Sequence, residues 1–259
     1  MSDKGLKLAV SGKGGVGKTT LAALLARHLA AGGKRVLAVD ADPVPCLAAA
    51  LGIALPIEPI VNMNDLIYER TGAQPGTMGG FFRMNPRVDD IPERFATVKD
   101  GVHLIVMGTV DHGGSGCVCP ESVLLKNLVQ HLVLYENDAL VMDMEAGVEH
   151  LGRATAKAVN LMLVVVEPGA RSLEAARTVK RLAADIGLTR VAAVANKVRG
   201  DGDLEIIRRG LGDIDLLGGM PYDPAFIEAD LAGRPAFADG IPGHLESLLR
   251  DIVELAGGG

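Results

Sequence analysis

Ten residues near the N-terminus have the types and spacing needed to bind phosphate. They run from Ser11 to Thr20, after an apolar stretch, Leu6–Val10, and before a helical pattern that begins at Leu21. The stretch fits G-x-x-x-x-G-K-T, in which glycine N–H groups and a helix N-terminus surround phosphate oxygens. The residues that we expect to contact a nucleotide here are Gly12, Gly14, Gly15, Val16, Gly17, Lys18, Thr19 and Thr20.

Lys18 and Thr19 have separate tasks in such a loop. The Lys18 ammonium is expected to contact the β- and γ-phosphates, and the Thr19 hydroxyl is expected to ligate Mg²⁺. The alternative is a glycine-rich turn that binds no ligand. The position of the stretch between a predicted strand and a predicted helix favours the phosphate-binding loop.

The same loop contains a second lysine, Lys13, which has no evident task within its own loop. The run K-G-G-x-G-K-T-T resembles the deviant phosphate-binding loop of the class formed by MinD, ParA and the nitrogenase iron protein. This resemblance implies a nucleotide-promoted homodimer in which Lys13 reaches the nucleotide of the partner subunit, so that Lys13 and Lys18 are both catalytic. The alternative for Lys13 is a solvated surface lysine.

Strand-length apolar runs alternate with helical patterns along the rest of the chain. This alternation predicts an α/β fold with a doubly wound, mainly parallel sheet and helices on both faces, as in P-loop NTPases. The predicted strands are Leu6–Val10, Arg35–Val39, Val102–Met107, Ala139–Met142, Leu161–Val166, Val191–Ala195 and Leu216–Met220, with a further short strand at Phe81–Met84. The predicted helices are Leu21–Ala31, Cys46–Leu51, Asn64–Arg70, Glu121–Tyr135, Glu149–Val159, Leu173–Ile186, Leu204–Leu211, Phe226–Ala232 and His244–Leu255. We expect a single domain over residues 1–259, with an irregular insertion at about 52–101.

Composition limits the possible functions. The chain has 259 residues, a formal net charge of −6 and no basic tail or block, which argues against binding to nucleic acid. Its three cysteines are a poor number for a disulfide framework, no secretory segment precedes the first strand, and the apolar runs are too short to span a membrane. We therefore expect a cytoplasmic protein that binds neither nucleic acid nor membrane.

Carboxylates close two of the predicted strands, at the edge where parallel sheets bind ligands. Asp40 and Asp42 end the second strand, and Asp143 follows Ala139–Met142. Two carboxylates at i and i+2 can face one Mg²⁺ ion, and the resemblance implies that Asp42 orients the attacking water while Asp40 lies on the metal side. Asp143 is expected to accept a hydrogen bond from a Mg²⁺-bound water, and Gly147 resembles the glycine that senses the γ-phosphate. For one aspartate of the pair, the alternative is a turn residue that caps a helix.

Two strand ends near the C-terminus are candidates for binding the base. Asn196 follows Val191–Ala195, and its amide could pair with the N6 and N7 edge of adenine, with Lys197 beside it. The run N-K-V-R lacks the aspartate of the guanine-specific N-K-x-D, which favours ATP over GTP. Pro221 and Tyr222 end the next strand, where the resembled class places a proline-containing loop around adenine.

Cys117 and Cys119 form a C-x-C pair before a helix that begins near Pro120. Both side chains of an extended C-x-C lie on one side of the backbone, and a helix N-terminus favours the thiolates that bind metal. Two sulfurs do not complete a tetrahedral site, so a two-fold homodimer that supplies the pair twice would give four thiolates for Ni²⁺ or Zn²⁺. Cys46 and His112 are further candidate ligands, and two small buried apolar side chains are the alternative.

A longer resemblance covers the chain from about Lys7 to Pro235. The motifs D-A-D-P-V-P-C-L, G-G-S-G-C-V-C-P-E and V-M-D-M-E-A-G-V-E-H-L-G-R resemble the CooC-type accessory ATPases, which are MinD-class proteins implicated in nickel insertion into carbon monoxide dehydrogenase. The resemblance implies an ATPase that binds ATP or ADP with Mg²⁺, holds nickel or zinc between two subunits, and has that enzyme as its client.

Two other functions within the same class stay open. A MinD- or ParA-like positioning switch normally has a basic amphipathic C-terminal helix, whereas the predicted helix His244–Leu255 is acidic and is expected to pack on the sheet. An electron donor like the nitrogenase iron protein bridges one iron–sulfur cluster with two separated cysteines per subunit, whereas Cys117 and Cys119 share one loop.

Overall fold

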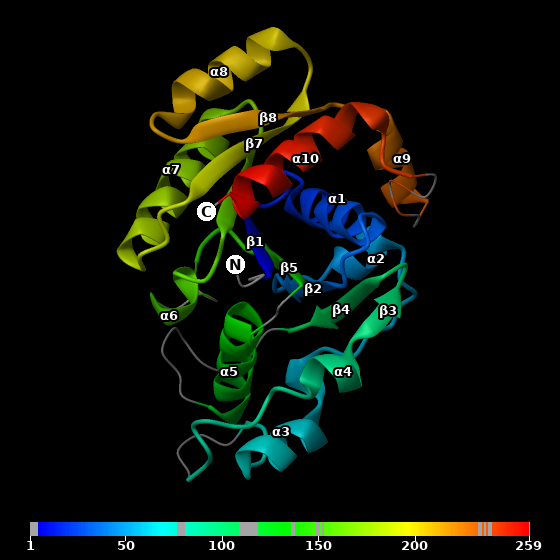
Figure 1. Ribbon diagram of the computed structural model, residues 1–259, viewed down its shortest axis with the longest axis vertical. Helices are drawn as coiled ribbons and strands as arrows, with labels where there is room; N and C mark the ends of the chain where they lie inside the picture. The colour runs from blue at the N-terminus through cyan, green and yellow to red at the C-terminus, as the bar shows by residue number, and fades with distance from the viewer. Residues whose placement is uncertain are drawn as a thin grey trace.

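The structure, a computed structural model, is built on one eight-stranded sheet (Figure 1). It describes residues 5–76, 81–108, 119–135, 138–148, 151, 153–232, 235, 237 and 240–258. The strand order is β3-β4-β2-β5-β1-β6-β7-β8; β3 pairs antiparallel with β4, and the other neighbours pair in parallel. The bounds are β1 Leu6–Ser11, β2 Val36–Ala41, β3 Thr97–Lys99, β4 Val102–Val106, β5 Ala139–Met144, β6 Leu161–Val166, β7 Val191–Val198 and β8 Asp215–Pro221. The prediction of a mainly parallel sheet is confirmed.

Helices cover both faces of this sheet (Figure 1). Side chains of α1, α2 and α10 pack with one face, and those of α3, α4, α5, α6, α7 and α8 pack with the other. The bounds are α1 Lys18–Ala31, α2 Leu47–Leu51, the 3₁₀ helix η1 Ile60–Asn62, α3 Asn64–Thr71, α4 Ile91–Phe95, α5 Pro120–Tyr135, α6 Arg153–Ala156, α7 Ala170–Asp185, α8 Asp201–Leu211, α9 Pro224–Leu231 and α10 Gly243–Gly257. The doubly wound architecture predicted from the alternating patterns is therefore present.

The two-residue period of the strands decides which side chains meet α1. In β2, Val36 and Ala38 pack on the α1 side of the sheet, and Leu37 and Val39 pack on the opposite side. Asp40 therefore continues the α1 side. The same alternation in β5 puts Ala139, Val141 and hence Asp143 on that side. Both carboxylates point toward the helix that carries Lys18.

The structure differs from the prediction in two ways. It contains short elements that were not predicted, and one predicted strand does not form. Residues Ile91–Phe95 form α4 and Thr97–Lys99 form β3, neither of which has a pattern long enough to be recognised alone. The strand predicted at Phe81–Met84 is wrong, because these residues form irregular chain. Phe81 is fully exposed and Met84 is 55% exposed, so neither side chain packs in the way that a half-buried strand requires. Of the predicted helix Glu149–Val159, the described part is the single turn α6.

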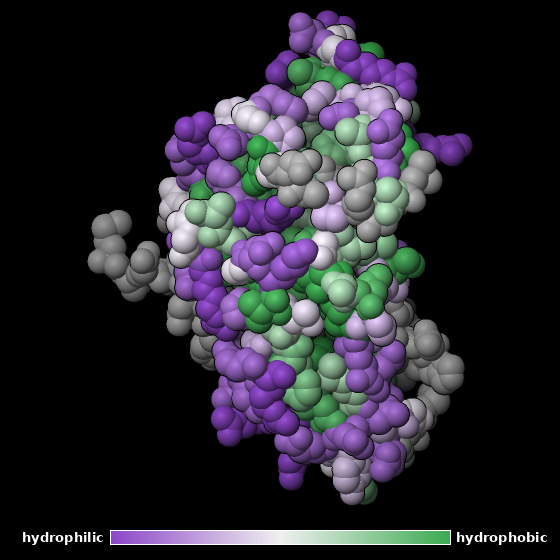
Figure 2. Space-filling model, turned by 90° about the vertical axis from the view of Figure 1, so that its right-hand side faces the viewer, coloured by the Kyte–Doolittle hydropathy of each residue, from purple (hydrophilic) through white to green (hydrophobic). Residues whose placement is uncertain are grey.

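Apolar side chains are exposed on one face of the molecule. Figure 2 views the structure from the right-hand side of Figure 1 and shows hydrophobic residues over the middle of that face. The exposed large apolar side chains of the chain include Val98 of β3 and Ile227 of α9. Among the described residues, no helix combines the length and the apolar character needed to cross a membrane.

Candidate active site

The phosphate-binding loop joins the end of β1 to the start of α1 and depends on glycine at three places. Gly12, Gly15 and Gly17 have φ values of 145°, 77° and 98°, which L side chains rarely adopt. Space is also short, because a Cβ on Gly12 would lie 2.5 Å from the Val165 carbonyl oxygen, and one on Gly17 would lie 2.1 Å from the Asn196 amide nitrogen. The loop therefore fits closely between β6 and β7, and α1 begins directly after it, at Lys18.

Lys18 lies buried at the first turn of α1 and faces Asp42. The Lys18 Nζ is 3.5 Å from Asp42 Oδ2, and the other carboxylate oxygen of Asp42 accepts the Val44 N–H at 3.0 Å. Lysine and aspartate thus meet where the loop, the helix N-terminus and the end of β2 converge. The two predicted catalytic residues of one subunit are brought together by this geometry.

Asp40 is fully buried and holds the turn that follows β2. Its Oδ2 accepts the N–H of Leu47, the first residue of α2, at 2.8 Å, and its Oδ1 accepts the Asp42 N–H at 3.3 Å. Burial raises the pKa of Asp40 to about 6, against the lowering effect of these backbone donors. Asp40 therefore serves as the cap of α2, the alternative that the sequence offered for one aspartate of the pair; its position on the metal side stays a prediction.

Asp143 is the register partner of Asp40 across β2 and β5 and is also fully buried. Neither of its carboxylate oxygens has a hydrogen-bond partner of normal geometry within the described part of the chain. Burial, helped by the negative charges of Asp40 and Asp42, raises its pKa to about 7, while Thr19 and Lys18 lie close enough to oppose the rise. A buried carboxylate without partners is costly unless a proton or a cation satisfies it, so Asp143 fits a Mg²⁺ ion and its water shell.

Ser11 connects the phosphate-binding loop to the chain after β5, a role that the sequence analysis missed. Its hydroxyl donates to the Glu145 carbonyl at 2.8 Å and accepts the Gly147 N–H at 3.2 Å. The predicted γ-phosphate sensor, Gly147, is therefore attached to the last residue of β1. A small hydroxyl residue directly before the first glycine of the loop was the only available signal in the sequence.

Asn196, predicted to contact adenine, also braces the phosphate-binding loop. Its Nδ2 donates to the Val16 carbonyl at 2.8 Å, and its Oδ1 accepts the N–H of Lys197 at 2.8 Å. The side chain is buried against Gly17, which has no Cβ to exclude it. Contact with the base stays a prediction, and it has to be made by an amide that already holds the loop.

Lys197 is a second brace of the same loop. The β7–β8 register is irregular between Ala195 and Val198, and Lys197 has a φ of 58°. Its Nζ donates to the Gly15 carbonyl at 2.7 Å and lies 3.1 Å from a carboxylate oxygen of Glu167, at the end of β6. Glu167 is a partner that the sequence analysis missed, since only the fold brings the ends of β6 and β7 to one loop.

A cavity of about 480 Å³ opens beside the loop. Its lining includes Gly15, Gly17, Thr19 and Thr20 of the loop and Asn196, Lys197, Pro221 and Tyr222 at the ends of β7 and β8. Its size falls within the range of small-molecule sites, about 300–1,000 Å³. Cys46, which is exposed, also lines this cavity. The predicted phosphate and base residues therefore share one pocket.

Comparison with known proteins agrees with this geometry. The profile of the CobQ/CobB/MinD/ParA nucleotide-binding domain matches residues 7–236. The chain belongs to this family.

Two relatives resemble the chain along most of its length. The carbon monoxide dehydrogenase accessory protein CooC of Rhodospirillum rubrum is 47% identical over 238 residues, which cover 90% of this chain and 89% of that protein. An ATP-binding protein of Methanocaldococcus jannaschii is 43% identical over 254 residues, which cover 96% of this chain and 98% of that protein. The resemblance to the CooC-type branch of the MinD/ParA class is confirmed, and the chain is an ATPase of this family.

The fold agrees with solved structures of the family. A ParA family ATPase of Chlorobium tepidum superposes with a TM-score of 0.68 at 18% identity, covering 97% of this chain and 98% of that chain. At this identity the likeness concerns the fold alone.

Lys13 lies in the turn of the loop that carries the family's motif. Its side chain is half-buried and makes no hydrogen bond or ion pair with the residues that the structure describes. Its carbonyl accepts the Val16 N–H at 3.4 Å. The backbone of Lys13 thus shapes the loop of this family member, while its ammonium remains available to an external anion; the role across an interface stays a prediction.

Of the predicted metal ligands of this family member, Cys117 and His112 lie outside the described residues. Cys119 is 3% exposed and directly precedes α5. Its sulfur accepts the Ser122 N–H at 3.5 Å and its thiol donates to the Ser122 hydroxyl at 3.1 Å, so the Cys119 side chain contacts the first turn of the helix. Within the described ranges, no three His, Cys, Asp or Glu side chains gather as a metal site.

Proposed function

We propose that the protein is a cytoplasmic, single-domain maturation ATPase that helps insert nickel into carbon monoxide dehydrogenase. The observation that carries the proposal is its 47% identity, over 90% of the chain, to a carbon monoxide dehydrogenase accessory protein. In this proposal, ATP binding closes a homodimer around a metal held by both subunits, and hydrolysis resets the dimer. Nickel, or zinc in its place, is the cargo of the cycle.

The phosphate-binding loop and Lys18 hold the phosphates in this scheme. Thr19 would ligate Mg²⁺ through its hydroxyl, and the Asp143 carboxylate would accept a hydrogen bond from a water of the ion. The ion, when bound, neutralises charge on the phosphates. Asp42, 3.5 Å from the Lys18 ammonium, is proposed to orient the attacking water. Lys13 is proposed to contact the nucleotide of the partner subunit.

The metal is proposed to bind Cys117 and Cys119 of both subunits. Four thiolates on a two-fold axis complete the tetrahedral site that Zn²⁺ prefers and also suit Ni²⁺. Support comes from the position of Cys119, whose sulfur lies at the N-terminus of the 16-residue helix α5 and accepts a backbone N–H there.

Size-exclusion chromatography with light scattering tests the proposal directly. The protein is run alone, with ADP, with a non-hydrolysable ATP analogue and with Ni²⁺ or Zn²⁺, and the metal in each peak is measured. We expect a dimer with the analogue or with metal, and one bound ion per dimer. Cys117→Ser combined with Cys119→Ser should abolish the bound ion, whereas the control Cys46→Ser should retain it. Unchanged metal content in the double variant would refute the cysteine site.

The client is tested separately, by activation of nickel-free carbon monoxide dehydrogenase. We expect the protein with ATP and Ni²⁺ to raise the rate or extent of activation above that with Ni²⁺ alone. The Lys13→Ala variant should remove the ATP-dependent part of this gain. Equal activation with and without the protein would refute this client.

A MinD-like positioning switch is the alternative within the family, and the C-terminal helix bears on it. The apolar side chains of α10, including Leu245, Leu249 and Ile252, are buried against the sheet, as expected from the sequence. The apolar stripe formed by these side chains therefore belongs to the core of the domain. Sedimentation with anionic liposomes and ATP tests the alternative, since co-sedimentation would favour it. A reducible iron–sulfur cluster, detected by electron paramagnetic resonance, would favour an electron donor instead.

A further inference from the structure

We propose that segment 52–101 is the support that positions the start of α5, directly after Cys119, and that Glu121 is the positioning residue through which it does so. The consequence for metal binding rests on the proposed function. The contacts themselves do not rest on the proposed function. They are made by described residues that lie before and after residues 109–118.

The first contact is made where the chain leaves β4. The Val61 N–H, in η1, donates to the Met107 carbonyl at 3.1 Å. Gly108 follows with a φ of 78°, and a Cβ at this position would lie 2.4 Å from Val61 Cγ1 and 2.8 Å from Pro59 Cβ. The chain thus passes η1 so closely that only glycine fits. Segment 52–101 therefore determines the path of the chain just before residue 109.

The second contact is made where the chain enters α5. Glu121 is buried in the first turn of the helix, and its Oε1 accepts the N–H of Gly76. Its Oε2 is buried without a partner among the described residues. A half-satisfied buried carboxylate is costly, and an apolar side chain would fill the same place without that cost. The hydrogen bond from Gly76 is a direct link between α5 and segment 52–101.

A third contact holds α5 two turns later. Asn127 Nδ2 donates to the Met84 carbonyl at 3.1 Å, and to the Val123 carbonyl of its own helix at 2.8 Å. The irregular chain that includes Met84 is itself attached to α3, because the Arg83 N–H donates to the Thr71 carbonyl at 2.8 Å. The failed strand prediction is explained by this arrangement, since the backbone pairs with α3 and α5 instead of the sheet.

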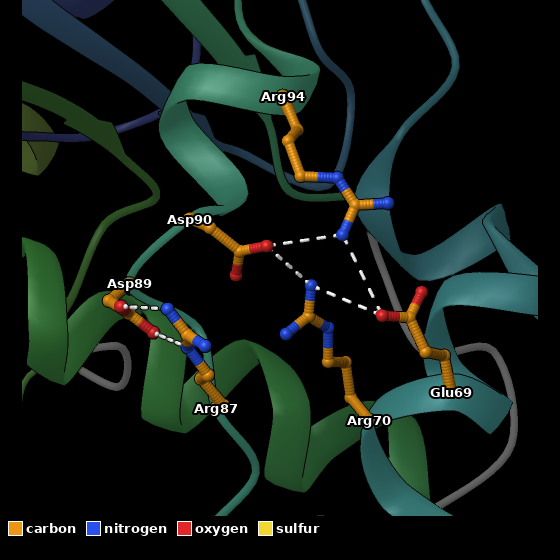
Figure 3. Close-up of polar contacts among 6 residues, drawn as sticks. All are labelled: Glu69, Arg70, Arg87, Asp89, Asp90 and Arg94. Carbon is orange, nitrogen blue, oxygen red and sulfur yellow. Dashed lines mark hydrogen bonds and ion pairs between the residues drawn. The ribbon is translucent and has the colours of Figure 1, made fainter.

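An ion-pair network stiffens the support (Figure 3). The buried guanidinium of Arg70, on α3, lies 2.7 Å from Asp90 Oδ2, at the start of α4. Arg94 reaches the same oxygen at 3.1 Å, and Glu69 lies 3.4 Å from Arg70 and 3.6 Å from Arg94. These charges connect the helix that leads to Gly76 with the helix that packs beneath β4. The supports of the two ends of residues 109–118 are therefore one connected unit.

This arrangement matters because Cys119 is two residues from Glu121. Functional ligands have to be held to within about 0.5 Å of their working positions. Helix α5 carries the Cys119 sulfur at its first turn, so any shift of that turn moves the sulfur. In a metal site that a second subunit completes, one chain supplies no further ligand that could replace a displaced Cys119 sulfur.

The test compares three full-length variants with the wild type. Glu121→Ala removes the link to Gly76, and Glu121→Gln keeps an acceptor oxygen for that N–H. Asp89→Ala is the matched control, because Asp89 pairs with Arg87 of the same segment and both side chains are exposed. Three quantities are measured: the alkylation rate of Cys119 in metal-free protein, followed by mass spectrometry; the nickel dissociation constant, from the Ni²⁺–thiolate absorption; and the ADP dissociation constant.

We expect Glu121→Ala to raise the alkylation rate of Cys119 and the nickel dissociation constant each by about tenfold, the lower end of the effect of losing a partner that orients a metal ligand. Glu121→Gln should restore both toward the wild type, and Asp89→Ala should change neither. ADP affinity should stay unchanged in all three, which separates loss of position from loss of fold. If Glu121→Ala fails to fold, Asn127→Ala is expected to show the same two changes to a smaller extent.

The inference would be overturned if Cys119 in Glu121→Ala were alkylated as slowly as in the wild type. It would also be overturned if Glu121→Gln and Glu121→Ala changed the alkylation rate and the nickel dissociation constant equally. The outcomes also separate it from the proposed function. If the wild type binds no nickel through its cysteines, the proposed metal site fails, and the alkylation rates still decide whether Glu121 positions α5.

Discussion

Asp143 and Asp90 lie in two regions of the molecule that shift the pKa of a carboxyl group in opposite directions. On the floor of the nucleotide site, burial raises the pKa of Asp143 to about 7 and that of Asp40 to about 6. In segment 52–101, the hydrogen bond from Arg70 lowers the pKa of Asp90 to about 2. A buried carboxylate without hydrogen-bond partners, such as Asp143, is suited to a cation that arrives with the nucleotide. A carboxylate paired with arginine, such as Asp90, is suited to holding two helices in a fixed arrangement.

The two regions also differ in what supports them. The phosphate-binding loop is braced by side chains from the ends of the central strands, among them Ser11, Asn196 and Lys197. Helix α5 is braced by segment 52–101, at its start through Gly76 and two turns later through Met84. A substitution in one region should therefore leave ligand binding by the other region unchanged. Each of the following substitutions tests that independence.

The largest effect is expected from Lys13→Ala. A cation supplied across an interface acts on transition-state charge, so we expect kcat for ATP hydrolysis to fall by about 10³-fold, the lower end of the effect of an arginine supplied in trans. Nucleotide affinity should be retained, and so should nickel binding by the nucleotide-free protein. Lys18→Ala should instead weaken nucleotide binding itself, as measured by calorimetry. Hydrolysis at the wild-type rate in Lys13→Ala would identify an ordinary phosphate-binding loop.

The next effect is expected from Asn196→Ala. This substitution leaves the buried Val16 carbonyl without its donor, which costs about 1–3 kcal/mol. We expect the cost to appear as weaker ADP binding in calorimetry, with nickel affinity unchanged. Lys197→Ala should have a smaller effect, because the Lys197 side chain is 44% exposed. Parallel losses of ADP and nickel affinity would show that the two regions are not independent.

The stability of the metal-free protein should depend on pH through the buried carboxyl group of Asp143. The folded pKa of Asp143, about 7, lies above the ordinary value of 3.8, so the folded protein keeps a proton that the unfolded chain releases. This contribution to stability is present in full below about pH 4 and is lost as the pH rises through about 7. We expect the Tm of metal-free protein to fall between pH 5 and pH 8, and to fall less in Asp143→Asn.

Magnesium with ADP supplies the control for this pH series. A bound cation favours the charged carboxylate, so the slope of Tm against pH should flatten when both are present. An identical slope in Asp143→Asn and the wild type would contradict the assignment of the titration to this residue.

The smallest effect is expected in acid, from Asp90→Asn. The pKa of Asp90 is lowered, so its contribution to stability is present above about pH 4 and is lost as the pH falls toward 2. The side chain is 30% exposed, and we expect Asp90→Asn to lower the Tm at pH 7 by a few degrees at most, with a smaller difference at pH 3. A difference that grows in acid would contradict the pairing with Arg70. Scanning calorimetry at the two pH values provides the measurement.

Much of the fold and the phosphate-binding loop could be predicted because the signals are local in the sequence. The phosphate-binding loop is one continuous motif, the parallel strands are unbroken apolar runs, and Asp40, Asp42 and Asp143 each end such a run. The strand period alone puts Asp40 and Asp143 on one side of the sheet. Short elements such as β3 and α4 have too few residues to show a period, and they form because β4 and the helix core are already in place.

The sequence by itself determined the nucleotide loop, the order of the longer strands and helices, and the position of Cys119 at a helix start. Only the tertiary structure decided that Asp40 caps α2, that Asn196 and Lys197 brace the loop, and that Glu121 links α5 to Gly76. These contacts join residues that are up to 182 positions apart in the chain. No local pattern encodes which distant backbone group a polar side chain will meet, because that depends on how strand ends and helix starts converge after folding.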